Sequence, residues 1–183
     1  MQGGAAPKAC LTAIGGKEAP VVSSKSSSMT YRITGLDREP FEHLFDLGDA
    51  ALAARNARRV VADKKPGFPC RITLEDADPG ERLILTNYVS HDAATPYRTA
   101  YAIYVREAAV DSAVYEGQLP PVLRGRPLSL RGFDGDGMLR GALLAMPGEA
   151  EDKILELFEN PEIGAIHAHN AAYGCFAAKI ERS

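Results

Sequence analysis

The amino-acid sequence predicts an α+β fold, in which a mainly antiparallel β-sheet carries a few short helices packed on it. Short segments rich in Val, Ile, Leu and Tyr recur between turns that contain Gly, Pro or Asp, as strands of such a sheet do. Residues 149–159 are the segment with the clearest signals of a helix. An apolar fraction of 45% and a charged fraction of 25% are typical of a globular protein.

The domain boundary is predicted from a change in composition. Residues 1–28 are rich in Gly, Ala, Ser and Lys, a composition that cannot offset the entropy lost on ordering, so we expect a disordered N-terminal tail. Residues 29–183 are expected to form a single globular domain, with Met29 as a hypothetical natural start. A domain of about 150 residues buries roughly 68–70% of its unfolded surface, which is enough for a core.

The first half of the domain is predicted to alternate short strands with one short helix. Residues 31–34 and 59–62 favour strands, and the alanines of 49–55 favour a helix that stops near Asn56. Residues 70–75 alternate between apolar and polar side chains, a pattern typical of a half-buried strand.

The second half continues with strands and one amphipathic helix. Residues 82–89 and 101–106 are strand candidates, and residues 127–133 and 138–146 flank the turn signal Asp-Gly-Asp-Gly, which predicts a β-hairpin.

The C-terminal segments complete this pattern. The helix at 149–159 begins after Pro-Gly and ends before Asn-Pro. Residues 163–169 and 175–180 are the two final strand candidates.

Charge and cysteine content argue against several classes of function. The formal net charge is −3, and basic residues do not cluster, so we expect no nucleic acid as a partner. No apolar run approaches the roughly 18–20 residues that span a bilayer, so no membrane association is expected. The three cysteines show no CxxC spacing, which favours a reducing, cytoplasmic setting over a disulfide framework.

One C-terminal segment concentrates side chains that could carry chemistry. His167 and His169 are two residues apart in a predicted strand and therefore point to the same face. A five-residue loop at 170–174 would place Cys175 opposite His169, and the three side chains would then share one patch. A four-residue loop would instead pair Asn170 with Cys175 and separate the thiol from the imidazoles.

Three interpretations of this segment remain open. His167, His169 and Cys175 could bind a transition metal, zinc or iron, because imidazole and thiolate are ligands of both. Cys175 could instead act as a nucleophile, with His169 as its base and Asn170 orienting an imidazole or an oxyanion. In the third interpretation, the histidines are hydrogen-bonded strand residues and the thiol is a small core residue.

Arginines offer a separate way to bind a ligand. Guanidinium groups that converge on a cleft bind carboxylates or phosphates, although a single arginine is more often part of a surface ion pair. Arg71 and Arg98 are the candidates that we place near the histidine segment. Five arginines lie next to Pro, Gly or aromatic residues or in apolar runs: Arg71, Arg98, Arg124, Arg126 and Arg131.

Several motifs in order are familiar in combination, and they cover residues 57–63, 66–71, 74–77, 79–81, 96–98, 128–131 and 167–176. With these motifs the chain resembles the bacterial family of domain of unknown function 1203, over residues 31 to 182. The resemblance implies a single domain that starts near Met29, and it draws attention to Cys70 and Arg71 as well as to the C-terminal segment. It implies no particular activity, substrate or cofactor.

The sequence therefore predicts a cytoplasmic protein that binds a small-molecule ligand or a transition metal near His167, His169 and Cys175. A thiol-dependent enzyme that uses Cys175 with His169 is the first alternative. An interaction domain without catalytic chemistry is the second. Neither an enzymatic reaction nor an oligomeric state follows from the sequence.

Overall fold

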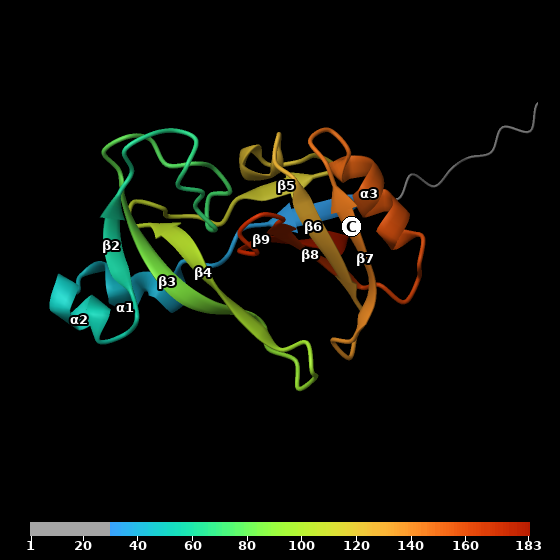
Figure 1. The fold of residues 1–183 in the computed structure, drawn as a ribbon, viewed down its shortest axis with the longest axis horizontal. Helices are drawn as coiled ribbons and strands as arrows, with labels where there is room; N and C mark the ends of the chain where they lie inside the picture. The colour runs from blue at the N-terminus through green and yellow to red at the C-terminus, as the bar shows by residue number, and fades with distance from the viewer. Residues whose placement is uncertain (1–29) are drawn as a thin grey trace, which may run out of the picture.

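The computed structural model describes residues 30–183, and the predicted tail, residues 1–28, lies outside the described residues. Two antiparallel sheets face each other, and helices are short, so the predicted α+β class is confirmed (Figure 1). The larger sheet contains, in order, β5 (Val114–Glu116), β1 (Tyr31–Thr34), β9 (Phe176–Arg182), β8 (Ala165–Asn170), β6 (Leu128–Phe133) and β7 (Leu139–Ala145).

The smaller sheet holds three strands, and helices flank both sheets. Its strands are β2 (Arg58–Val61), β3 (Arg82–His91) and β4 (Thr99–Arg106), with β3 in the middle. The helices are α1 (Glu39–Phe45), α2 (Asp49–Ala53) and α3 (Ala150–Phe158), and a 3₁₀ turn covers Pro121–Leu123. Within residues 30–183, no helix has the length and apolarity needed to cross a bilayer.

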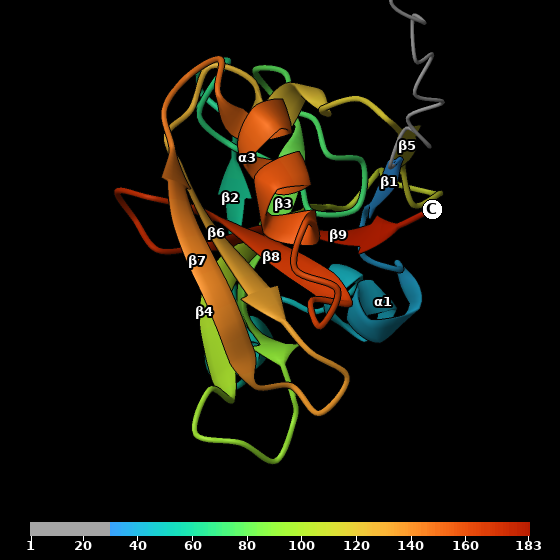
Figure 2. The same ribbon diagram turned by 90° about the vertical axis from the view of Figure 1, so that its right-hand side faces the viewer.

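Helix α3 covers one face of the larger sheet (Figure 2). Its Ile154 and Phe158 are fully buried against Leu130 and Ile166 of strands β6 and β8. Burying one such side chain contributes about 1.5–3 kcal/mol, so this layer is a main source of stability. The opposite face of the same sheet packs against the smaller sheet.

A second core lies between the two sheets. Phe176 of β9 packs with Phe41 of α1 and with Ile84 and Ile103 of the smaller sheet. Tyr88 bridges this cluster, because its ring centroid is 5.8 Å from that of Phe41 and 6.1 Å from that of Phe176. The sheets also meet near the β3–β4 and β6–β7 connections, where the ring of His91 stacks on that of Phe133 with centroids 4.1 Å apart.

The predicted strand at 70–75 is wrong. This segment forms turns with isolated bridges, of which one joins Cys70 to Tyr104, and Leu74 has a positive φ of 53°. Ile72 and Leu74 are buried as expected, but Arg71 is also buried, at 4% exposure. The alternation of apolar and polar residues misled here because the side chain of Arg71 points inward and donates to backbone carbonyls. The segment therefore has no regular solvent-exposed face.

Helix α1 has no counterpart among the predicted elements. It is only seven residues long and buries just Phe41 and Leu44, which is too little apolar spacing to reveal a helix. Strand β5 (Val114–Glu116) was not predicted either, because it has only three residues. The remaining strands and the helix at 149–159 agree with their predicted ranges to within three residues. The β6–β7 hairpin around residues 134–137 is confirmed as well.

Candidate functional site

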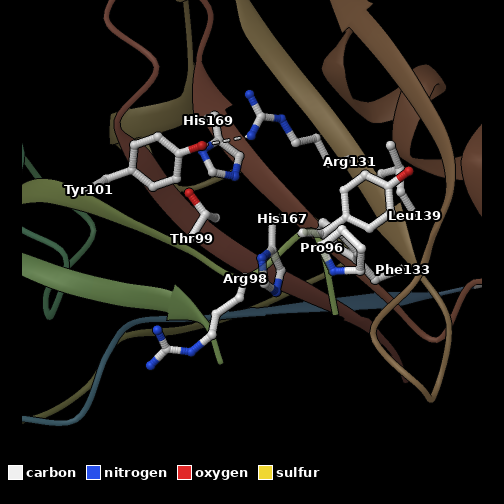
Figure 3. A pocket seen from close by; sticks show the side chains of 10 residues that line it. Pro96, Arg98, Thr99, Tyr101, Arg131, Phe133, Leu139, His167 and His169 are labelled. Atoms are coloured by element: carbon white, nitrogen blue, oxygen red, sulfur yellow. Dashed lines mark hydrogen bonds between the residues drawn. The ribbon is translucent and has the colours of Figure 1, made fainter. Parts of the chain in front are cut away.

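A pocket of about 330 Å³ is lined by side chains from both sheets (Figure 3). Its walls come from the β3–β4 connection, β4, β6, β7 and β8, and they mix aromatic, basic and imidazole side chains. The lining residues are Pro96, Tyr97, Arg98, Thr99, Tyr101, Arg131, Phe133, Leu139, His167 and His169.

Strand register explains why the basic and imidazole groups meet. In the β6–β8 pair, Arg131 lies opposite His167, and Ser129 lies opposite His169. Alternate residues of a strand share a face, so Arg131, His167 and His169 all project away from α3. The predicted common face of the two histidines is therefore observed.

Both histidines are buried and neutral at pH 7. Their side chains lie among Phe133, Phe176 and Tyr101, and exposure is 5% for His167 and 1% for His169. Burial, followed by nearby positive groups that include Arg131, lowers the pKa of His167 to about 3. Burial and then the charge of Arg131 lower the pKa of His169 to about 4.

Hydrogen bonds fix the proton position on His169. Its Nδ1 lies 3.1 Å from the carbonyl oxygen of Gly174, and a carbonyl only accepts, so Nδ1 carries the proton. Nε2 of the neutral ring is then a hydrogen-bond acceptor. Within the described residues, Nδ1 of His167 is buried without a hydrogen-bond partner, which costs about 1–3 kcal/mol.

Arg131 is the charged group at the centre of the pocket wall. Its Nη1 donates to the hydroxyl oxygen of Tyr101 at 2.8 Å. Among residues 30–183, no carboxylate lies within 4.0 Å of its guanidinium. Burial raises the pKa of Tyr101, but hydrogen bonding by Thr99 and Arg131 and the arginine charge outweigh it and leave this pKa below its usual value.

The two arginines predicted to bind a ligand occupy different environments. Arg98 lies at the pocket mouth, where its Nε donates to the carboxylate of Asp92 at 2.7 Å, and both side chains are largely exposed. Arg71 does not line the pocket. Its guanidinium donates to the carbonyls of Phe176, at 2.5 Å, and Pro69, at 2.7 Å, and burial lowers its pKa to about 10. It ties the 69–76 turns to β9.

The β8–β9 register separates Cys175 from the histidines. Asn170 N–H donates to the Cys175 carbonyl at 2.9 Å, and Phe176, not Cys175, lies opposite His169. A bulge between β8 and β9 then places Lys179 opposite His167. Of the two loop lengths left open by the sequence, the four-residue loop is therefore the one observed, since Asn170 pairs with Cys175 and the thiol is separated from the imidazoles.

Cys175 and Asn170 instead have local partners. The thiol of Cys175 lies 3.9 Å from the Tyr173 carbonyl oxygen, a weak contact within its own loop. The side-chain oxygen of Asn170 accepts from the backbone N–H groups of Ala172 and Tyr173, both at 3.0 Å, and so caps the turn. Neither side chain reaches the histidines through a hydrogen bond.

The described residues place few further metal-ligating groups beside the two histidines. In the described part of the chain, no group of three or more His, Cys, Asp or Glu side chains is placed to hold a metal ion. The ring centroids of His167 and His169 are 6.4 Å apart, and the nearest further imidazole, His91, uses Nε2 to donate to the Gly137 carbonyl at 2.8 Å. The positive charge of Arg131 would also oppose a cation here.

Two residues of the pocket, Arg131 and Tyr101, are not marked as neighbours of the histidines by the sequence. Arg131 is one of five candidate arginines, but the pairing of β6 with β8 that brings it to His167 is a long-range contact. Its position as a lone charge in the apolar run 128–133 was the available signal. Tyr101 was treated only as part of a strand.

Together these features define a two-sheet α+β domain with a small polar pocket between its sheets. Residues 67–182 match the family described as "Protein of unknown function (DUF1203)", and the chain belongs to this family. The matched range includes every pocket residue. No curated protein and no solved structure matches the chain.

Proposed function

We propose that the protein binds a small organic anion in the pocket between the sheets, with Arg131 as the anchor. The observation that carries this proposal is the half-buried guanidinium of Arg131, which has no carboxylate partner among residues 30–183. The other half-buried arginines in this range each contact a carboxylate: Arg38, Arg59, Arg106 and Arg126. The more deeply buried Arg71 instead donates to two backbone carbonyls, whereas Arg131 donates, within the described residues, only to the Tyr101 hydroxyl. A guanidinium removed from water without a counter-ion is costly, and an anionic ligand would supply that counter-ion.

The hydrogen-bond donors and acceptors around Arg131 indicate which polar groups the ligand should carry. A guanidinium binds carboxylates and phosphates through two parallel hydrogen bonds. The Tyr101 hydroxyl accepts from Arg131, so its own proton is free to be donated to the ligand. Nε2 of His169 is an acceptor, and it would receive a hydrogen bond from a hydroxyl or amine of the same ligand.

The remaining walls favour a ligand with an apolar part. Phe133, Leu139 and Tyr97 line the pocket beside the polar groups. Arg98 at the mouth uses its Nε to pair with Asp92, and its other guanidinium N–H groups could donate to an anion at the opening. A carboxylate or phosphate with a neighbouring hydrogen-bond donor and a short apolar or aromatic portion fits these walls.

This proposal keeps the small-ligand half of the expectation from sequence. A site for zinc or iron would need a third ligand beside His167 and His169. A thiol mechanism would need Cys175 to approach an imidazole.

The proposal is tested by thermal unfolding and calorimetry with a panel of carboxylates and phosphates. A ligand present at 100 times its Kd stabilises the folded state by about 2.7 kcal/mol. We expect stabilisation by members of the panel that is lost in Arg131→Met. The matched control is Arg124→Met, which removes an exposed arginine whose Nε donates to the Leu119 carbonyl outside the pocket. Anion binding that persists unchanged in Arg131→Met would refute the proposal.

A further inference from the structure

Part of strand β3 has an edge with no neighbouring strand among residues 30–183. β2 pairs with β3 only from Arg58, opposite Leu85, to Val61, opposite Arg82. β4 pairs along nearly the whole length of β3. On the β2 side, no strand of the described part of the chain therefore lies beside the stretch from Thr86 to Ser90.

Hydrogen bonds at the start of β3 show which backbone groups face this edge. Ala62 N–H donates to the Glu81 carbonyl on the β2 side, and Glu107 N–H donates to the Arg82 carbonyl on the β4 side. Successive residues of an antiparallel strand alternate in the side to which their N–H and C=O groups point. Asn87 and Val89 therefore direct these groups to the open edge.

Natural edge strands usually carry features that prevent further pairing, such as charges or prolines. The stretch from Thr86 to Ser90 has neither, since its sequence is Thr-Asn-Tyr-Val-Ser. Both Asn87 and Val89 are exposed. This edge is thus chemically open to another extended chain.

A groove of about 490 Å³ runs beside the open edge. Helix α1 forms its other wall through Pro40, Phe41 and Leu44, and Tyr88 and Val89 contribute from β3. An added strand would lie about 4.7–4.9 Å from β3 and would send alternate side chains toward these apolar groups. The groove therefore fits an extended segment of about five residues, at roughly 3.3 Å per residue.

The charges at one end of the groove favour an acidic occupant. Arg55 lines the groove, and within residues 30–183 its guanidinium donates only to the Ala51 carbonyl and contacts no carboxylate. Arg58, three residues further along the chain, is exposed at the start of β2. A strand added antiparallel to β3 would run in the direction of β2, so its C-terminal end would approach these two arginines.

We propose that the open edge of β3 and helix α1 form a docking groove for an extended peptide with apolar residues at alternate positions and a carboxylate at its C-terminal end. The peptide adds a strand to the smaller sheet by pairing with Asn87 and Val89. This groove is separate from the anion pocket, because no residue lines both.

The test uses the full chain and a displayed library of random decapeptides with free C-termini. Enriched sequences are synthesised with a fluorescent label, and their affinity is measured by fluorescence polarisation. Asn87→Pro removes the outward-facing N–H without breaking a β3–β4 hydrogen bond, and the matched control Val61→Pro does the same at the outer edge of β2. We expect affinity to fall about tenfold in Asn87→Pro and to stay unchanged in Val61→Pro.

Two further measurements address the mode of docking. Amidating the peptide C-terminus, or Arg55→Gln, should weaken binding several-fold. In the unsubstituted protein, amide exchange of Asn87 and Val89 should slow when the peptide is bound, a readout that does not depend on how any variant folds.

Three outcomes would overturn the proposal. The library could enrich no sequence on the unsubstituted protein beyond those enriched on Asn87→Pro. The enriched peptides could also bind Asn87→Pro with the same affinity as the unsubstituted protein. Alternatively, sedimentation could show a dimer that Asn87→Pro dissociates, in which case the edge is used by a second copy of the chain.

Discussion

The buried histidines make a quantitative prediction about acid stability. His167 and His169 have pKa values of about 3 and about 4 in the folded protein, against an ordinary value of 6.5. Below pH 6.5 the unfolded chain therefore binds more protons at these positions than the folded chain does. Stability rises with pH in this window, and it falls as the pH drops from 7 toward the folded values.

The magnitude follows from the size of these shifts. Between pH 7 and pH 5, each histidine should remove about 2 kcal/mol from the free energy of unfolding, so the pair removes about 4 kcal/mol. This loss is a large fraction of the roughly 5–15 kcal/mol by which a domain is stable. The groups that set the shift of His167, after burial, are His91, His169, Lys179 and Arg131.

Urea unfolding at pH 7, 6 and 5 measures this loss directly. In His167→Leu, the decrease between pH 7 and pH 5 should be smaller by about 2 kcal/mol than in the unsubstituted protein. His169→Asn should reduce it similarly while keeping a donor for the Gly174 carbonyl. His43→Gln, on the exposed side of α1, should leave the decrease unchanged. Equal pH dependence in all four proteins would show that the histidines of the pocket are not buried as neutral groups.

Other substitutions test the remaining structural claims. Arg71→Met should lower the free energy of unfolding by about 2–4 kcal/mol, measured by urea titration, because it leaves the Phe176 and Pro69 carbonyls unsatisfied; a loss below about 0.5 kcal/mol would contradict this role. Cys175→Ser should change stability by less than about 0.5 kcal/mol and should leave anion affinity intact by calorimetry, whereas a loss of anion affinity would show that the thiol belongs to the site. Gly137→Ala should lower the melting temperature, because this glycine has a φ of 79° and an added Cβ would collide with Ala93; an unchanged melting temperature would argue against the packing of these two loops.

Local sequence patterns predicted most strands because those strands have one apolar face or a clear turn between them. The hairpin at residues 134–137 is an example, since Asp-Gly pairs tolerate the backbone angles of a tight turn. The segment at 70–75 was wrongly predicted as a strand because its structure depends on distant residues. Its alternation was real, but Arg71 is held inside by hydrogen bonds to residues that a local pattern does not include.

The candidate site was predicted in part. Strand periodicity was sufficient to place His167 and His169 on one face. Periodicity could not supply the loop length that sets the partner of Cys175, because a shift of one residue exchanges the two faces of a strand. It also could not bring Arg131 and Tyr101 together, since they come from different sheets and meet only through the packing of those sheets.

The carbonyl of Gly137 has a consequence for how a ligand would enter the pocket. It accepts hydrogen bonds from Nε2 of His91, at 2.8 Å, and from the hydroxyl of Thr95, at 3.2 Å, so the tip of one hairpin is fastened to the connection beside the pocket mouth. The two walls are thereby held apart at a set spacing before any ligand arrives. A preorganised opening of this kind avoids the entropy of ordering a loop during association. Ligands should therefore bind in a single fast step, with affinity differences between them expressed mainly in the dissociation rate.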